Sequence, residues 1–349
     1  MKALVYQGPG KKSWEDVPDP TIQDPNDVIV KIDTTTICGS DLHILKGDVP
    51  TVEPGRVLGH EGVGTIVEVG SGVSKFEAGH RVVVNCITTC GTCPYCRVGH
   101  PSHCQSAGGI GWLLGHLVNG TQAEYVRIPF GETSLHSIPP GLSDEEVIFV
   151  SDIIPTGYEM GVLNGDVQPG NDVVVIGAGP VGLAAMVTAQ LKSPRRIIAV
   201  DLDDFRLEAA RKSFGATHTV NSGREGWKEE VRALTRHGGA DVVMEAVGVP
   251  VTLEAAFELV RPTGRIANIG VHGAPVTMPI DRLWIENITM TMGLVDAVTA
   301  PTLIELIEAG KLNVRPLATH HFKLNEMLDA YDVFGKAAKN EALKVVIQS

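Results

Sequence analysis

The sequence predicts an α/β fold in two parts: a mainly β domain, and a domain built on a doubly wound parallel sheet. The chain has 349 residues, which is more than a single hydrophobic core usually supports. Up to about residue 150, short strand-like runs are separated by turns rich in glycine and proline. Beyond about residue 155, strand-like runs alternate with helix-like stretches, which is typical of βαβ units.

In the first part, residues 28–32, 62–69 and 81–85 have the composition of strands, and residues 70–72 and 139–141 that of turns. In the second part, helices are expected in the stretch that ends at residue 191 and at 205–214, and strands at 173–176, 197–200, 241–247, 265–270 and 288–293. Right-handed crossovers between these strands would place helices on both faces of the sheet.

The last part of the chain contains a helix-like stretch at 301–309 and a strand-like segment at 343–347. We expect this tail to return to the first domain, which is then discontinuous. One domain would span residues 1–154 and 297–349, and the other residues 155–296.

Composition excludes several classes of protein. Apolar residues make up 43% of the chain and charged residues 20%, as in globular proteins. The net charge of −12 disfavours nucleic acid or an anionic membrane as the main partner. No apolar run approaches the roughly 20 residues of a membrane span, and the first residues do not resemble a secretory signal. A cytoplasmic location is therefore expected.

Four of the six cysteines form a metal-binding pattern. Cys90, Cys93, Cys96 and Cys104 are spaced as C-x2-C-x2-C-x7-C, which suits four thiolates around a tetrahedral zinc ion. Because the protein fills all four positions, this zinc is expected to be structural. Free or disulfide-bonded cysteines are the alternative, which the tight clustering disfavours.

A glycine-rich turn follows the first strand of the second part. Residues 173–182 read VVVIGAGPVG, and three of the glycines match the G-x-G-x-x-G pattern. These glycines permit a tight turn, the approach of a pyrophosphate and close packing of helix on strand, while the helix N-terminus attracts phosphate. The dinucleotide-binding residues expected here are Gly177, Gly179, Pro180, Val181, Gly182, Asp201 and Arg206.

Asp201 indicates which dinucleotide is bound. It ends the second strand, 19 residues after Gly182, where an acid accepts hydrogen bonds from the adenosine ribose hydroxyls. The 2′-phosphate of NADP would meet three carboxylates, those of Asp201, Asp203 and Asp204, so NAD is favoured. A glycine turn beside an unrelated surface aspartate is the alternative.

Two segments nearer the start of the chain stand out: residues 38–43 read CGSDLH, and residues 58–64 read LGHEGVG. Taken separately, Cys38 and His60 are better explained as buried core residues. Together with the four-cysteine loop, the GAGPVG turn and Asp201, and in this order, the segments resemble the zinc-containing medium-chain alcohol dehydrogenase family. The resemblance covers essentially the whole chain. It implies a GroES-like mainly β catalytic domain, an inserted Rossmann NAD-binding domain, and a catalytic zinc between them.

The resemblance implies that Cys38 and His60 are ligands of the catalytic zinc, the second zinc of the chain. Many relatives have a third cysteine ligand where this chain has none. The segment 151–157, SDIIPTG, is similar to the version with an aspartate found in bacterial secondary alcohol dehydrogenases, which implies Asp152 as the third ligand. Glu61 is then an acid behind the ligands or an exchangeable extra ligand. Three protein ligands leave one zinc position open, where zinc lowers the pKa of an alcohol.

The family also implies a proton route and a substrate pocket. Ser40 would accept the proton first, and His43 would pass it to solvent after the nicotinamide ribose hydroxyls. Trp112 would narrow the pocket, whose implied lining is Cys86, Ile87, Trp112 and Leu294. The alternatives are helix capping by Ser40 or Asp152, simple solvent exposure of His43, and a core position for Trp112.

The sequence therefore predicts an NAD-dependent zinc alcohol dehydrogenase that acts reversibly on a small primary or secondary alcohol and the matching aldehyde or ketone. A butanediol, polyol or aldehyde-related dehydrogenase of the same fold is one alternative. A catalytically inactive zinc-binding relative is another. The resemblance also implies a homo-oligomer, a tetramer more than a dimer.

Overall fold

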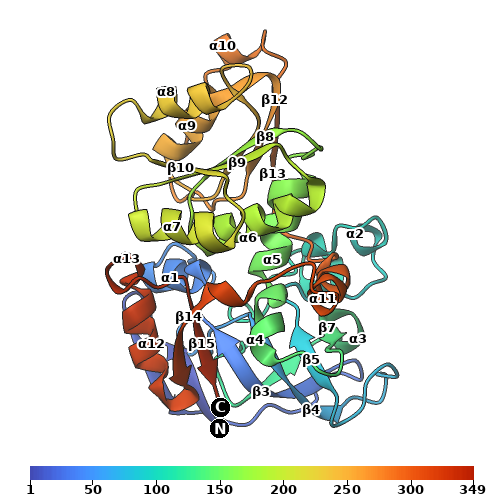
Figure 1. The fold of residues 1–349 in the computed structure, drawn as a ribbon. Coiled ribbons are helices and arrows are strands. Elements are labelled where there is room, and N and C mark those ends of the chain that lie inside the picture. The colour runs from blue at the N-terminus through green and yellow to red at the C-terminus, as the bar shows by residue number, and fades with distance from the viewer. The chain divides into compact units, whose positions relative to one another are not determined.

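The computed structural model describes residues 1–349, which divide into two compact units. Unit 1 comprises Met1–Asp152 and Asp296–Ser349, and unit 2 comprises Ile153–Val295. The blue N-terminal and red C-terminal segments therefore share one unit (Figure 1). None of the helices combines the length and the apolar character needed to cross a bilayer.

Unit 1 is built on a seven-stranded sheet of order β14-β15-β3-β4-β5-β7, with β6 also paired to β3. A separate antiparallel pair consists of β1 (Lys2–Tyr6) and β2 (Lys12–Asp16). Strand β15 runs antiparallel to β3, with Val346 opposite Thr36, so the end of the chain completes a sheet begun near its start. The strands are β3 (Val28–Thr36), β4 (Gly62–Val69), β5 (Arg81–Val84), β6 (Tyr125–Ile128), β7 (Leu135–Ser137), β14 (Ala318–Lys323) and β15 (Lys344–Gln348).

The helices of unit 1 are short, and two of them bear on the site. Helix α12 (Met327–Phe334) buries Met327, Tyr331 and Phe334 along one side, in a core that also contains Ile44 of α1 (Gly39–Lys46). The remaining helices are α2 (Pro94–Arg97), η1 (Pro101–His103), η2 (Gln105–Ala107), α3 (Gly131–Ser134), α4 (Asp144–Val147), η3 (Ile148–Ser151), α11 (Ala300–Glu308), η6 (Arg315–Leu317), η7 (Leu324–Glu326) and α13 (Ala337–Asn340).

Unit 2 contains a six-stranded parallel sheet of order β10-β9-β8-β11-β12-β13. The strand order reverses between β8 and β11, and such reversals create the ligand crevice of open α/β sheets. The strands are β8 (Asp172–Ile176), β9 (Arg196–Asp201), β10 (His218–Asn221), β11 (Ala240–Glu245), β12 (Val260–Asn268) and β13 (Thr289–Met292).

Helices cover both faces of this sheet: α6 and α7 lie together on one side, and α8 and α9 on the other (Figure 1). The predicted combination of a mainly β part and a doubly wound parallel sheet is confirmed. The helical segments are α5 (Ile153–Thr156), the π-helical η4 (Gly157–Leu163), α6 (Pro180–Ala189), η5 (Gln190–Lys192), α7 (Asp204–Ser213), α8 (Trp227–Leu234), α9 (Pro250–Leu259) and α10 (Ile280–Leu283).

Several predicted boundaries in unit 2 were wrong. The strand expected at 265–270 is β12, which begins at Val260 and ends at Asn268. Strand β11 was expected to reach residue 247 but ends at Glu245. The Glu245 carboxylate accepts hydrogen bonds from the backbone N–H groups of Val247 and Gly248, each at 2.9 Å. Because these N–H groups donate to the Glu245 side chain, they do not pair with a neighbouring strand, and the strand ends.

Candidate metal and dinucleotide sites

The position of Cys38 follows from how helix α1 begins. Cys38 is the N-cap residue, and its backbone N–H donates to Asp41 Oδ2 at 2.9 Å. The helix ends at Gly47, whose φ of 88° is a conformation that favours glycine. Ser40 lies inside the first turn and is not the N-cap residue, and Asp41 at the third helical position completes a capping box with Cys38.

A mixed cluster of ligand atoms forms at this helix start. One ligand atom from each of Cys38, His60, Glu61 and Asp152 lies within 4.8 Å of the others. Asp152 Oδ2 accepts a hydrogen bond from Cys38 Sγ at 3.5 Å and lies 3.2 Å from His60 Nε2. Asp152 follows η3 and is 114 residues away from Cys38 in the sequence. The fold thus brings together the thiol, imidazole and carboxylates that the sequence motifs single out.

The electrostatics of the cluster favour a bound cation. Burial raises the pKa of the Cys38 thiol, and the charges of Asp152 and Glu61 raise it further. Burial lowers the pKa of His60, but its hydrogen bonds to Asp152 and Cys38 more than offset this and raise the pKa well above its usual value. The raised pKa of His60 and the contribution of Asp152 and Glu61 to that of Cys38 reflect negative charge in the cluster, which a divalent metal would neutralise. A thiolate, an imidazole and a carboxylate form a donor set that fits zinc.

Glu61 is held by a buried lysine. Lys344 Nζ lies 2.5 Å from Glu61 Oε2 and also donates to the carbonyl oxygen of Ile37 at 2.8 Å. Both charged side chains are 1% exposed. Burial lowers the pKa of Lys344, but the nearby negative charges, first that of Glu61, raise it above its usual value. Glu61 therefore has one oxygen paired with lysine, while Oε1 has no hydrogen-bond partner.

Replacing Lys344 with Met is expected to lower the free energy of unfolding by about 3–5 kcal/mol, because it leaves the Glu61 carboxylate buried without its cation. Burial already raises the pKa of Glu61, and without the lysine that pKa rises further above the unfolded value. The destabilisation should therefore shrink as the pH falls and Glu61 takes up a proton. Urea unfolding across pH measures this. The double change Lys344→Met, Glu61→Gln is the control and should regain much of the loss.

The two proton-route candidates occupy different environments. Ser40 Oγ lies 3.4 Å from His60 Nε2, beside the cluster. His43 Nδ1 lies 2.8 Å from Asp48 Oδ2, and the two side chains are 33% and 43% exposed. Ser40 is therefore next to the ligand atoms, whereas His43 reaches solvent.

Of the residues expected to line a substrate pocket, Trp112 lies beside the cluster. Its ring meets that of His60 edge-on with centroids 5.9 Å apart, and it packs against His116 at 4.6 Å. Cys86 and Ile87 are buried just after β5. Leu294 is half-buried and belongs to unit 2.

The four-cysteine loop forms a second, separate cluster. One ligand atom from each of Cys90, Cys93, Cys96 and Cys104 lies within 4.8 Å of the others, and none is in a disulfide. The Cys93–Cys96 and Cys90–Cys96 sulfur atoms are 3.4 and 4.0 Å apart. A zinc tetrahedron with Zn–S bonds of about 2.3 Å has edges of about 3.8 Å. Burial raises the pKa of Cys90, but hydrogen bonds from Ser106 and Thr92 lower it to about 5. This donor set also fits zinc.

The glycine turn of unit 2 leaves an open cradle at the start of α6. Gly177 has a φ of 100°, and a Cβ on Gly182 would lie 1.8 Å from the Gly177 carbonyl oxygen, so neither accepts a side chain. A Cβ on Gly179 would meet only Arg206 Nη1, at 3.8 Å. Gly179 caps the helix, and Pro180 and Val181 form its first turn.

Acidic and basic groups flank this cradle. Asp201 accepts hydrogen bonds from the backbone N–H groups of Ala178 at 2.6 Å and Asp203 at 2.9 Å. Arg206 Nε is buried and has no hydrogen-bond partner. A pyrophosphate would be the anionic partner of the N–H groups at the start of α6 and of the Arg206 guanidinium. The Asp201 carboxylate has further lone pairs that can accept hydrogen bonds from ribose hydroxyls. The residues therefore fit a nicotinamide dinucleotide.

Sequence reasoning assigned no role to four residues around the mixed cluster. Lys344 could have been noticed as a single charge within the apolar segment 343–347. Asp41 could have been noticed as an acid three residues after Cys38. Gln122 and Tyr331 offered none, because nothing local marks a glutamine or a tyrosine that becomes buried beside a distant site.

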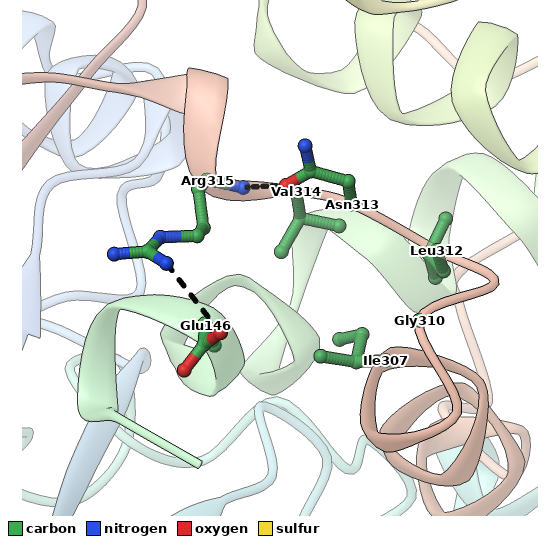
Figure 2. A pocket seen from close by; sticks show the side chains of 7 residues that line it. All are labelled: Glu146, Ile307, Gly310, Leu312, Asn313, Val314 and Arg315. Atoms are coloured by element: carbon green, nitrogen blue, oxygen red, sulfur yellow. Dashed lines mark hydrogen bonds and ion pairs between the residues drawn. The ribbon is translucent and has the colours of Figure 1, made fainter.

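One surface pocket of about 260 Å³ lies between α11 and α4 in unit 1 (Figure 2). Its polar groups contact one another: Arg315 Nη1 lies 3.7 Å from Glu146 Oε1, and the Arg315 backbone N–H donates to Asn313 Oδ1 at 3.2 Å. None of the residues predicted for a site lines it.

Comparison with known proteins identifies the family. The description "Alcohol dehydrogenase GroES-like domain" matches residues 24–140, and "Zinc-binding dehydrogenase" matches residues 180–309. The chain is 35% identical over 370 residues to an alcohol dehydrogenase of Cupriavidus necator, covering 100% of this chain and 98% of that protein.

Solved structures agree. Zinc-dependent alcohol dehydrogenase 2 of Streptococcus pneumonia is 48% identical with a TM-score of 0.95, covering 100% of this chain and 98% of that one. An alcohol dehydrogenase of Thermus sp. ATN1 is 38% identical with a TM-score of 0.91, covering 100% and 99%. The GroES-like plus Rossmann fold is confirmed. The chain therefore belongs to the zinc-dependent, medium-chain alcohol dehydrogenase family of nicotinamide-dependent oxidoreductases.

Proposed function

We propose that this protein transfers hydride reversibly between a small alcohol and NAD, with a catalytic zinc held by Cys38, His60 and Asp152. The observation that carries the proposal is the mixed cluster, whose ligand atoms lie within 4.8 Å of one another. Glu61 shares the cluster but is paired with Lys344. Three protein ligands leave a position for the substrate oxygen, as in other catalytic zinc sites.

At this site zinc supplies Lewis acidity, which lowers the pKa of an alcohol and, in the reverse reaction, polarises a carbonyl. Oxidation removes a hydride and a hydroxyl proton from the alcohol. In this proposal Ser40, whose Oγ lies 3.4 Å from His60 Nε2, accepts the proton. His43, which is half-exposed and paired with Asp48, then releases it to water. Trp112, edge-on to His60, limits the size of the substrate.

A second zinc is proposed at Cys90, Cys93, Cys96 and Cys104. These thiols fill all four positions of a tetrahedron, so no position remains for a substrate. Binding energy at such a site is folding energy for the loop that carries it.

Turnover of a panel of small alcohols tests the proposed function. We expect oxidation of short primary or secondary alcohols with NAD, and reduction of the matching aldehydes or ketones with NADH. Diols and polyols in the same panel separate the sister activities on this fold. Protein that holds two zinc ions per chain but turns over no alcohol would contradict the proposal.

A preference for NAD over NADP is expected from Asp201. Asp201→Gly should weaken NADH binding by about 1–3 kcal/mol, which is the worth of a hydrogen bond to a charged group. The same change should reduce the difference between the affinities for NADH and NADPH. Fluorescence titration with NADH and NADPH measures both. Asp204→Asn, the control, removes a nearby exposed charge and should leave NADH affinity unchanged. Tighter binding of NADPH than of NADH by the wild type would contradict this prediction.

A homo-oligomer is proposed from the edge of unit 2. Strand β13 is the last strand of its sheet, so one side of its backbone is unpaired. Large apolar side chains are exposed in β13 and in the segment that precedes it, including Met292 at 62% and Trp284 at 71%. Trp284→Lys is expected to reduce the molar mass measured by light scattering, whereas Val251→Lys, at an exposed position of α9, should not. The tetramer and the cytoplasmic location stay predictions.

A further inference from the structure

A series of buried hydrogen bonds connects helix α12 to Asp41, whose carboxylate faces His60. The Tyr331 hydroxyl donates to Gln122 Oε1 at 2.8 Å, and Gln122 Nε2 donates to Asp41 Oδ2 at 3.1 Å. The other carboxylate oxygen of Asp41 faces His60 Nδ1 at 3.9 Å. All four residues are at most 4% exposed, so water hardly competes for their polar groups.

The amide of Gln122 has one orientation that satisfies its partners. Its Nε2 also donates to the carbonyl oxygen of Thr36 at 3.2 Å. A backbone carbonyl only accepts hydrogen bonds, so the nitrogen must point to this side and the oxygen must face Tyr331. The tyrosine hydroxyl therefore acts as the donor, and the direction of donation runs from Tyr331 towards Asp41.

One carboxylate oxygen of Asp41 accepts the hydrogen bond from Gln122, and the other faces the imidazole of His60. Its Oδ2 accepts from Gln122 and from the backbone N–H of Cys38, neither of which can accept in return. Asp41 Oδ1 and His60 Nδ1 are both buried, and neither has a hydrogen-bond partner. These two atoms are complementary if the imidazole proton is on Nδ1, which leaves Nε2 without a proton.

Backbone geometry makes room for the connection. Gly59, directly before His60, has a φ of 95°, and a Cβ there would lie 2.6 Å from Gln122 Cγ. The glycine of the Gly59-His60 pair thus allows Gln122 to pack against the segment that carries the imidazole. The Tyr331 ring also contacts a cation, because Lys12 Nζ lies over it at 5.2 Å from the ring centroid.

We propose that Tyr331 and Gln122 are positioning residues for His60, which keep Asp41 directed at Nδ1 so that Nε2 is free to bind metal. The inference rests on the proposed zinc site, since His60 Nε2 is the atom that lies 3.2 Å from Asp152. Groups that orient a ligating histidine in this way typically change metal affinity 10–100-fold. Helix α12, late in the chain, thereby takes part in the metal site.

Zinc affinity, measured on the fully loaded protein by competition with a chromophoric chelator, tests the proposal without relying on turnover. Tyr331→Phe removes only the hydroxyl, and Gln122→Met removes the amide at similar volume. Tyr6→Phe is the matched control, because Tyr6 is buried in the same core but takes no part in this connection. Cys38→Ser retains only the four-cysteine site, so its titration shows which part of the zinc release comes from that site.

We expect Tyr331→Phe to weaken the His60 site about 10-fold and Gln122→Met up to about 100-fold, with the four-cysteine site unchanged. Because both act through Asp41, the double variant should bind like Gln122→Met alone, whereas independent structural damage would be additive. Additive losses, or a Tyr331→Phe affinity equal to that of Tyr6→Phe, would overturn the proposal. If Gln122→Met does not fold, the comparison of the two tyrosine variants decides. A wild type with no zinc beyond the four-cysteine site would instead overturn the proposed function.

Discussion

Cys38→Ser is expected to abolish turnover and to lower the zinc content from two ions per chain to one, while the protein stays folded. A serine hydroxyl is a much weaker zinc ligand than a thiolate, and zinc favours sulfur and nitrogen donors. The thiol is one of the ligand atoms of the mixed cluster and lies 3.5 Å from Asp152 Oδ2. The fold should persist because serine is a favourable N-cap residue and can replace Cys38 at the start of α1. Metal analysis, activity and urea unfolding of the same sample measure these effects.

Cys93→Ser is the matched comparison, with the same substitution at the other cluster. It should also remove one zinc per chain, but its main effect should be loss of stability or assembly, because the four-cysteine loop has little apolar core of its own. Wild-type protein that is fully active with one zinc per chain would show that the assignment of two sites is wrong.

Ser40→Ala is expected to lower turnover roughly 10²–10⁴-fold with both zinc ions and NADH binding intact. Hydride does not leave efficiently from a neutral alcohol, so the hydroxyl proton must leave first. A site that excludes water needs an internal acceptor for that proton. Ser40 Oγ is the hydroxyl of α1 that lies beside the cluster, 3.4 Å from His60 Nε2. Alcohol oxidation measured across pH gives the size of the effect.

Two further variants separate proton transfer from simple packing. Ser40→Thr keeps the hydroxyl and should restore most of the activity that Ser40→Ala loses. His43→Gln should cost much less than Ser40→Ala, because His43 is 33% exposed and water can replace it. Added imidazole should recover part of that loss. Near wild-type turnover of Ser40→Ala with zinc fully bound would mean that water reaches the alcohol directly.

Features that depend on neighbouring residues could be predicted from the sequence. The glycines of the turn 177–182 are required by backbone contacts within that turn, such as the 1.8 Å approach of a Cβ on Gly182 to Gly177. The four cysteines lie within one short loop, so their spacing already implied a shared ion. Strand 62–69 followed from its composition and has the predicted bounds. By contrast, β11 ends at Glu245 and not at residue 247 as predicted, because the Glu245 side chain accepts hydrogen bonds from the next backbone N–H groups.

The mixed cluster depended on resemblance, since Cys38 and His60 taken alone suggested core residues. The tertiary structure adds the groups that hold the cluster. Glu61 and Lys344 are 283 residues apart, and Gln122 and Tyr331 are 209 apart. A buried charge or amide is stable only when its partner is present, and that partner can come from any segment that the fold packs beside it. The sequence by itself determined the glycine turn, the four-cysteine loop and most of the strands, because their causes are local. Only the tertiary structure decided that strand β15 and helix α12 complete the surroundings of Glu61 and His60, because those contacts arise when distant segments pack together.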